Sequence, residues 1–315
     1  GRQKNPYNPP DPGTGWQSRG YRTRVREYGF ALQGCMRMTR LRTEDIESLK
    51  ADLPSYERRL RHQTGCTLLG IACRAVGMSE QDVARRLAEG LQIAVIPVTS
   101  GDGVIGGFSE TVCGIASYLG ADAFVTAASD VAGLAEAYER KADVLMLSDD
   151  ARFVAINTLT RRVSDNAKLT ARGFVAGLDL MVGGLRGRAV LVMGCGLVGR
   201  AAAKGLASIG AAVSLCDSVP CRSHALAGEL KAEAAATVRV EDDLKTALHH
   251  YRILFDATPA ANIIDAAQVN GETFVAGPGM PCGVTPEAAV RLGDRLLHDP
   301  LQIGVAAMLA DAVAL

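Results

Sequence analysis

Aromatic residues are scarce in this sequence of 315 residues, where they make up 5% and include one tryptophan. Hydrophobic cores must therefore be built mostly from Ala, Val, Leu and Ile, and a hydrophobic fraction of 48% is enough to build them. A net charge is also lacking, because 34 Lys and Arg balance 34 Asp and Glu. The composition therefore does not favour a nucleic-acid partner or an acidic membrane surface.

The eight cysteines include no CxxC pair, and no Cys/His cluster has zinc-finger spacing. Scattered thiols in apolar segments are typical of reduced residues in a cytoplasmic protein, and we expect no metal. No apolar run reaches the roughly 18 residues of a membrane span, and the sequence shows no signal-peptide pattern. The sequence leaves the oligomeric state open, a homodimer included.

Residues 1–37 differ in composition from the rest, because Gly, Pro, Asn and Arg dominate and no apolar period runs through them. Such a composition cannot bury enough surface to offset the entropy of ordering, which predicts a disordered or non-native tail. Met38 would be a natural start, and a nucleic-acid-binding arm is the less favoured alternative.

Residues 38–171 alternate between short apolar runs and helical patterns. The runs at 93–98, 123–126 and 144–147 predict buried strands, and the patterns at 106–119 and 131–141 predict helices between them. Ser79 is a candidate N-cap of an earlier helix, and Leu49, Leu53, Tyr56 and Leu60 recur at helical steps. This alternation predicts an N-terminal α/β domain with a parallel sheet, in which the substrate binds.

Residues 172–315 carry the same alternation and predict a Rossmann domain for NAD. A long helix over 166–184 connects the two domains, and an apolar helix over 303–313 ends the chain. Thr285 followed by Pro286 predicts another helix start. Strands are expected at 188–193, 212–216, 253–257, 273–276 and 295–297. The predicted fold class is therefore α/β, with two domains.

The strand that ends at Met193 leads into a GxGxxG pattern. Gly194 permits the tight turn, Gly196 lets the backbone approach a pyrophosphate, and Gly199 removes a side chain where helix meets strand. The following helix directs its free N–H groups at the phosphates. Asp217 ends the next strand, 18 residues after Gly199, where a carboxylate hydrogen-bonds the adenosine ribose and repels the phosphate of NADP. We therefore expect NAD.

Two further loops follow strands, at the edge where open α/β sheets bind ligands. Their small residues would let the nicotinamide and its ribose approach the backbone. The predicted cofactor-binding residues are Gly194, Cys195, Gly196, Leu197, Val198, Gly199, Asp217, Ala257, Thr258, Pro259, Pro278 and Gly279.

A polar, glycine-rich segment, IPVTSGDGVIGGFSETV over 96–112, follows a strand of the first domain. Thr99, Ser100 and the turn amides could bind a carboxylate or an amine-bearing group, and Ser109 and Glu110 open the next helix. A tight turn with a carboxylate at a helix start is the alternative. The adjacent acids Asp149 and Asp150 follow another strand, where one could hold an ammonium group or act as a base, and solvated loop acids are equally compatible with the pattern.

Several of these segments, in order, resemble the pyrrolysine synthases. They are IPVTSGDGVIGGFSETV, LMLSDDARFVAIN, GCGLVG with Asp217, FDATPAANII, GPGMPCGVT and DPLQIGVAAML. The resemblance extends from about Met38 to the C-terminus, and the first block is the most specific because it is not a general Rossmann feature. The block closes with Thr111 and Val112 where we would expect Ser and Leu, a difference that bears on packing.

This resemblance implies an NAD-dependent oxidation of the terminal primary amine of L-lysine-Nε-3-methyl-D-ornithine. The second ornithine amine then attacks, ammonia is expelled, and a pyrroline ring forms. The family's site, transferred to matching positions, implies substrate binding by Thr99, Ser100, Ser109 and Asp149. It implies catalytic roles for Ser100, Glu110 and Asp149, of which Asp149 is the first choice to hold or deprotonate the amine. The family's N-terminal helix, here near 43–61, is expected to help close the site.

Two other functions stay open from the sequence. One is another NAD-dependent amino-acid or imine dehydrogenase, or a cyclodeaminase, with the same build. The other is a non-catalytic NAD sensor, against which the polar segment argues, because a sensor needs no such cluster facing the cofactor.

Overall fold

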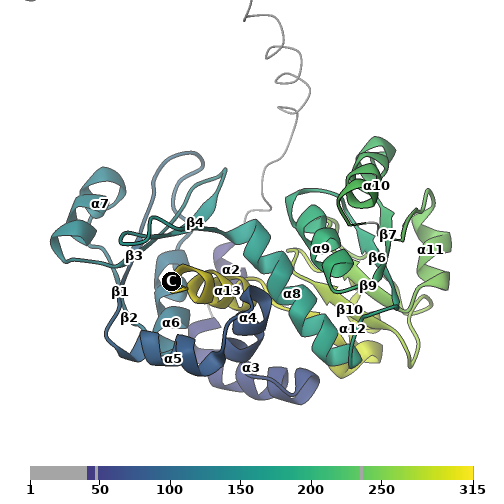
Figure 1. Cartoon of the computed structure of the whole chain (residues 1–315), viewed down its shortest axis with the longest axis horizontal. Helices are drawn as coiled ribbons and strands as arrows, with labels where there is room; N and C mark the ends of the chain where they lie inside the picture. The colour runs from purple at the N-terminus through teal and green to yellow at the C-terminus, as the bar shows by residue number, and fades with distance from the viewer. Residues whose placement is uncertain (1–40, 47–48, 235–236, 315) are drawn as a thin grey trace, which may run out of the picture. The chain divides into compact units, whose positions relative to one another are not determined.

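The computed structural model describes residues 41–46, 49–234 and 237–314. The predicted tail of residues 1–37 lies outside this part. The described residues form one compact unit that contains two sheets (Figure 1). The predicted α/β class is therefore confirmed. The predicted domain boundary between residues 171 and 172 falls inside a helix that touches both sheets, and it stays a prediction.

The first sheet has the order β2-β1-β3-β4-β5. Its strands are β1 (Gln92–Ile96), β2 (Asp122–Val125), β3 (Val144–Ser148), β4 (Phe153–Asn157) and β5 (Val163–Asp165). The first three are parallel, as predicted, because a helix crosses over between each pair. The strands β4 and β5 were not predicted, and each pairs antiparallel with the strand before it.

Most helices of this part lie close to the predicted residues, whereas α4 was not predicted. They are α2 (Thr43–Ile46), α3 (Leu49–Thr64), α4 (Leu68–Val76), α5 (Glu80–Ala88), α6 (Phe108–Tyr118) and α7 (Asp130–Glu139). In α3, Leu53, Tyr56 and Leu60 are buried, as their helical spacing predicts. Ser79 is the N-cap of α5, although its side chain makes no capping hydrogen bond.

The second sheet is parallel throughout, in the order β11-β10-β9-β6-β7-β8. Its strands are β6 (Ala189–Met193), β7 (Ala212–Cys216), β8 (Val238–Val240), β9 (Ile253–Asp256), β10 (Phe274–Gly277) and β11 (Leu296–His298). This is the doubly wound order of dinucleotide-binding domains, and its switch point lies between β6 and β9.

Helices cover both faces of this sheet (Figure 1). They are α9 (Leu197–Ser208), α10 (Pro220–Ala234), α11 (Leu244–His250), α12 (Pro286–Leu292) and the short 3₁₀ helix η1 (Gly293–Arg295). Side chains of β6 alternate between the two faces, so Val190 and Val192 join one core cluster while Leu191 and Met193 join another. Thr285 caps α12 by accepting the N–H of Ala288, as the Thr-Pro pair predicts.

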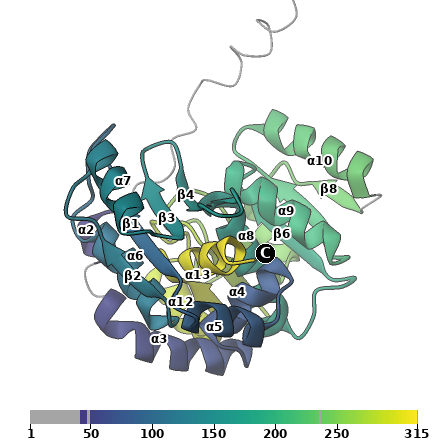
Figure 2. The ribbon, with the colours of Figure 1, turned by 60° about the vertical axis from the view of Figure 1, so that its left-hand side comes forward.

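Helices α8 (Asn166–Val182) and α13 (Gln302–Ala312) lie beside each other and beside α4 (Figures 1 and 2). All residues of α13 are buried, which explains its largely apolar sequence. Its one acid, Asp311, accepts hydrogen bonds from the Arg162 guanidinium and from Ser164. Burial alone would raise the pKa of Asp311, but these bonds outweigh it and lower the pKa.

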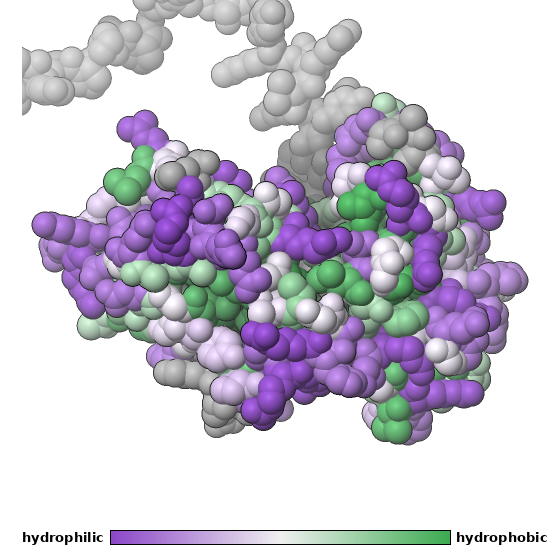
Figure 3. All heavy atoms as spheres, turned by 60° about the horizontal axis from the view of Figure 1, so that its bottom comes forward, coloured by the Kyte–Doolittle hydropathy of each residue, from purple (hydrophilic) through white to green (hydrophobic). Residues whose placement is uncertain are grey.

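The outer surface shows no single large apolar face in the view from below. Figure 3 shows mainly hydrophilic residues there, with hydrophobic residues in small separate groups. Within the described part of the chain, no helix is long and apolar enough to cross a membrane.

Candidate functional site

The turn between β6 and α9 has the geometry that the glycine pattern predicts. Gly194 has a φ of 84°, which a residue with a side chain rarely adopts. A Cβ atom at Gly199 would overlap the carbonyl oxygen of Gly194, so both positions require glycine. Gly196 is the N-cap of α9 and has no side chain to cap the first turn, which leaves a positive helix end with backbone N–H groups for an anion.

Asp217 lies beside this turn, directly after β7. One carboxylate oxygen accepts the N–H of Cys195 at 2.6 Å, and the other accepts the N–H of Val219 at 2.8 Å. The sequence predicts that Asp217 lies next to the turn, but it does not predict that the carboxylate stabilises the turn through these hydrogen bonds. Asp217 therefore has a structural role in addition to its predicted ribose contact.

The loop after β9 meets this turn, and the loop after β10 meets the loop after β9. A Cβ atom at Gly194 would lie 2.8 Å from the carbonyl oxygen of Ala257, and one at Gly279 would lie 2.7 Å from that of Thr258. The structure thus brings the predicted cofactor residues of three loops together at the carboxyl ends of β6, β9 and β10. Leu197, at the start of α9, keeps 47% of its surface exposed.

Asp256 is a residue of this region that the sequence reasoning missed. It is the last residue of β9 and is 2% exposed, and it accepts the N–H of Thr258 at 3.0 Å and its hydroxyl at 2.7 Å. Burial raises the pKa of Asp256, although the Thr258 hydrogen bonds oppose the shift. An acid that directly ends an apolar strand is the signal that could have found it.

The polar segment lies between β1 and α6, and its residues differ in their surroundings. Thr99 is bound to Asp130, whose carboxylate accepts the Thr99 N–H at 2.8 Å and hydroxyl at 2.5 Å. These hydrogen bonds lower the pKa of Asp130, an acid that the sequence reasoning did not single out. Ser100 is exposed. In α6, Ser109 is buried at 4% exposure, whereas Glu110 is exposed.

Asp149 follows β3, the strand next to β1, so it lies at the same edge of the sheet as the polar segment. Its Oδ1 accepts the N–H groups of Ala151 at 2.8 Å and Arg152 at 2.7 Å, which forms the turn into β4. Asp150 joins the two loops, because its carboxylate accepts the N–H of Asp102 at 2.8 Å. Of the predicted substrate-side residues, Thr99, Ser100 and Asp149 thus lie at one edge of the sheet, whereas Ser109 and Glu110 lie in the first turn of α6.

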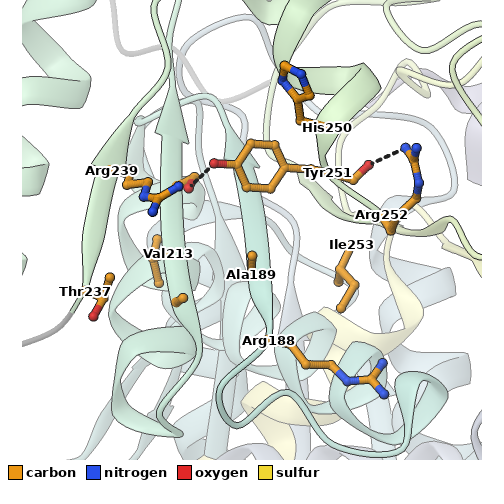
Figure 4. A pocket seen from close by; sticks show the side chains of 11 residues that line it. Arg188, Ala189, Val213, Thr237, Arg239, His250, Tyr251, Arg252 and Ile253 are labelled. Carbon is orange, nitrogen blue, oxygen red and sulfur yellow. Dashed lines mark hydrogen bonds between the residues drawn. The ribbon is translucent and has the colours of Figure 1, made fainter.

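A cavity of about 520 Å³ opens at the opposite edge of the second sheet (Figure 4). Residues at the amino ends of β6, β7 and β9 line it, including Arg188, Arg239 and Arg252. The Tyr251 hydroxyl bonds to Ser214 and Glu241 at 2.6 Å each. This cavity is separate from the turn at Gly194, which lies at the carboxyl ends. Among the described residues, no group of three or more His, Cys, Asp or Glu side chains is placed to hold a metal.

Comparisons with known proteins cover most of the chain. Residues 45–164 match the family described as "Pyrrolysine biosynthesis protein PylD, N-terminal domain", and residues 164–287 match "Alanine dehydrogenase/PNT, C-terminal domain". The chain is 29% identical to a protein named pyrrolysine synthase from Methanosarcina acetivorans, over 86% of this chain and 98% of that protein. Another of that name, from Methanosarcina barkeri, is 28% identical over 87% of this chain and 98% of its own length.

A solved structure, quinate dehydrogenase from Corynebacterium glutamicum in complex with NAD, shares the fold. It has a TM-score of 0.51 and 16% identity, and covers 71% of this chain and 94% of its own. This likeness concerns the fold alone. The sequence comparisons confirm the resemblance to the pyrrolysine synthases. They support an oxidoreductase of the dehydrogenase type with a Rossmann-type domain.

Proposed function

We propose that this chain is an NAD-dependent oxidoreductase that acts on the CH–NH2 carbon of L-lysine-Nε-3-methyl-D-ornithine and completes pyrrolysine. The observation that carries the proposal is the glycine turn at 194–199, with Asp217 at the end of the neighbouring strand. The similarity to the pyrrolysine synthases, which spans 86% of the chain, supports the choice of substrate.

The residues of the turn fit a dinucleotide. The first N–H groups of α9 would bind the pyrophosphate, and Asp217 would accept hydrogen bonds from the ribose hydroxyls while disfavouring a phosphate there. The exposed Leu197 side chain would be covered by the bound cofactor. The loops at Thr258 and Gly279 would border the nicotinamide end. When bound, NAD supplies the hydride acceptor.

The polar segment over 96–112 would hold the substrate against the nicotinamide end of the bound dinucleotide. Asp149 would take a proton from the terminal ammonium or hold the neutral amine, because hydride leaves a carbon only when its nitrogen can donate electrons. Loss of the hydride and of a proton gives an imine. The second ornithine amine then adds to the imine carbon, ammonia leaves, and the ring closes. Thr99, Ser100, Ser109 and Glu110 would orient the amine and carboxylate groups.

The proposal is tested by giving the purified chain NAD and the lysine–methylornithine conjugate. We expect NADH absorbance to rise and pyrrolysine to be detected by mass spectrometry, with little product when NADP replaces NAD. Absence of NADH, in a preparation that binds NAD by calorimetry, would refute the proposed substrate. NADH formation with other diamino acids but not with the conjugate would instead favour a different amine dehydrogenase or a cyclodeaminase.

We expect Asp149→Asn to lower kcat by about 100-fold or more, the scale of a lost proton acceptor, while the Kd for NAD stays unchanged. Asparagine keeps the Oδ1 atom that accepts the N–H groups of Ala151 and Arg152, so the turn into β4 is retained. Asp122→Asn, at the exposed start of β2, is the matched control. Turnover equal to that of the control would remove Asp149 from the reaction.

We expect Asp217→Asn to weaken NAD binding by about tenfold and to reduce the preference for NAD over NADP, because the negative charge that repels a 2′-phosphate is lost. Calorimetric Kd values for both dinucleotides measure this. Asp217→Ala also removes the acceptor for the Cys195 and Val219 N–H groups, so it should lower the melting temperature further. An unchanged ratio of the two Kd values in Asp217→Asn would contradict the ribose contact.

A further inference from the structure

The first residue of α7, Asp130, is an acid to which the proposed reaction assigns no role. It has a φ of 53°, in the left-handed region that residues with a side chain seldom adopt. Backbone strain of this kind costs free energy and persists only where the surrounding structure fixes it. The strained conformation is therefore tied to the contacts that Asp130 makes.

Asp130 holds the chain that follows β1 through three hydrogen bonds. Its N–H donates to the Pro97 carbonyl at 2.9 Å, and its Oδ1 accepts the Thr99 N–H at 2.8 Å. Its Oδ2 accepts the Thr99 hydroxyl at 2.5 Å, which is the length of a charge-assisted hydrogen bond. The backbone and the side chain of Asp130 thus both fix the start of the polar segment over 96–112.

The position of Asp130 is itself fixed by α7, which lies beside β1 (Figure 2). Glu136, one and a half turns further along this helix, accepts the N–H groups of Ala127 at 3.2 Å and Ala128 at 3.0 Å. The helix also packs tightly on the loop before it, because a Cβ atom at Gly133 would overlap the carbonyl oxygen of Ala128. The Asp130 carboxylate is therefore held against Thr99 before any ligand binds.

The contact with Asp130 determines how the Thr99 hydroxyl can act on a ligand. A hydroxyl has one hydrogen and two lone pairs, whereas an ionised carboxylate only accepts. The hydrogen bonds from Thr99 lower the pKa of Asp130, so the carboxylate is ionised near neutral pH. The single hydroxyl hydrogen is therefore donated to Asp130, and only the lone pairs of Thr99 Oγ1 remain for a ligand.

An oxygen that can only accept favours an ammonium group over a carboxylate. An ammonium group carries three donors and no acceptor, so it can donate to Thr99 Oγ1. A carboxylate has acceptors only, and at the same place its lone pairs would meet those of the hydroxyl without a hydrogen between them.

The charges at this edge of the first sheet favour the same ligand. Hydrogen bonds join the stretches 97–107, 126–130 and 149–152, which contain several acids and one base. That base, Arg152, donates to the Asp165 carboxylate at 2.8 Å. A carboxylate ligand would therefore meet negative charges and a cation that is already paired, whereas an ammonium group would be attracted.

We propose that Asp130 is a positioning residue that orients the Thr99 hydroxyl as an acceptor, so that the subsite at Thr99 takes an ammonium group of the substrate and rejects a carboxylate. This inference rests on the proposed function, because it concerns the same substrate site. It decides between the two ligand classes that the sequence leaves open for Thr99. The conjugate offers ammonium groups to this subsite, and its single carboxylate binds elsewhere.

The inference is tested with Asp130→Asn, which reverses the hydroxyl with little change in shape. The asparagine Oδ1 still accepts the Thr99 N–H, and asparagine tolerates a positive φ. Its amide NH2 replaces Oδ2 and donates to Thr99 Oγ1, so the hydroxyl hydrogen turns toward the ligand. We expect KM for the conjugate to rise about tenfold while kcat falls less than about threefold. Asp122→Asn, at the start of β2, is the matched control and should leave KM unchanged.

A double-mutant cycle with Thr99→Val shows whether Asp130 acts through the hydroxyl. Thr99→Val keeps the branched shape without the oxygen and should raise KM about tenfold by itself. Adding Asp130→Asn should then raise KM by less than about twofold. If Asp130 acted through its charge alone, or only by supporting the loop, its replacement would raise KM equally with and without the hydroxyl, and the inference would be wrong.

The remaining outcomes separate this inference from the proposed function. A wild-type chain that forms no NADH from the conjugate would refute both. An active wild type with an unchanged KM in Asp130→Asn would overturn the inference alone. Thr99→Val leaves the left-handed residue untouched, so it tests the hydroxyl even if the melting temperature of Asp130→Asn is low. An unchanged KM in Thr99→Val would equally contradict the ammonium subsite.

Discussion

Gly199→Ala is expected to abolish measurable dinucleotide binding, with a loss of affinity of about 100-fold or more. The added methyl group would overlap the carbonyl oxygen of Gly194, a rigid backbone atom that cannot rotate away. The start of α9 must then move from the end of β6, which displaces the N–H groups that would bind the pyrophosphate. Titration calorimetry with NAD measures the loss, and chemical denaturation reports the accompanying destabilisation of about 1–3 kcal/mol.

The same helix offers a matched control in Gly205→Ala. A Cβ atom there would lie 3.8 Å from the Val175 side chain, which is ordinary contact. Replacing glycine inside a helix should leave NAD affinity unchanged and stabilise the chain by roughly 0.5–1 kcal/mol. If Gly199→Ala bound NAD as well as Gly205→Ala does, the turn would not be the pyrophosphate site.

Five of the six strands of the second sheet could be predicted because their signals are local, whereas the short strand β8 was not predicted. The predicted strands are short apolar runs, most crossovers are helices, and the glycine pattern needs only six consecutive residues, 194–199. The structure shifts the predicted strand ends by a residue or two. The placing of Asp217 beside the turn also follows from local order, since β6 and β7 are consecutive and adjacent.

The strands β4 and β5 were missed because the turn before them was interpreted as a chemical site. Asp149 and Asp150 attract attention as acids after a strand, yet the Asp149 side chain stabilises the turn that returns the chain as β4, and the Asp150 side chain accepts the N–H of Asp102. The apolar run at 153–156, Phe-Val-Ala-Ile, is the sequence signal that could have revealed β4. Turn formation does not exclude the proposed role of Asp149, because only Oδ1 accepts those N–H groups.

Contacts between distant segments could not be predicted from the sequence. Tyr56 and Asp299 are 243 residues apart, and Arg162 and Asp311 are 149 apart, so no local pattern connects them. The hydrogen bond between His298 and the Gly277 carbonyl is of the same kind. His298 is one of five scattered histidines, and only the parallel pairing of β10 with β11 places it beside Gly277.

The Tyr56–Asp299 contact joins α3 to the start of α13 inside the protein, and removing it should cost much of the stability. The Tyr56 hydroxyl donates to Oδ2 of Asp299 at 2.6 Å, and Oδ1 accepts the N–H groups of Leu301 at 3.0 Å and Ile303 at 3.3 Å. Tyr56 and Asp299 are both 3% exposed. Burial raises the pKa of each group. Because water does not reach either side chain, each depends on the other for its hydrogen bond.

We expect Tyr56→Phe to lower the free energy of unfolding by about 1–3 kcal/mol, because it leaves Oδ2 buried without its donor. Asp299→Ala should cost about 3 kcal/mol or more, since a hydroxyl and two N–H groups lose their acceptor. Tyr138→Phe, on a tyrosine that is 60% exposed, is the control and should change stability by less than about 0.5 kcal/mol. Urea denaturation measures all three. A Tyr56→Phe variant as stable as the control would show that the hydroxyl contributes nothing to stability. The double-mutant cycle of Tyr56→Phe with Asp299→Ala measures how strongly the two side chains are coupled.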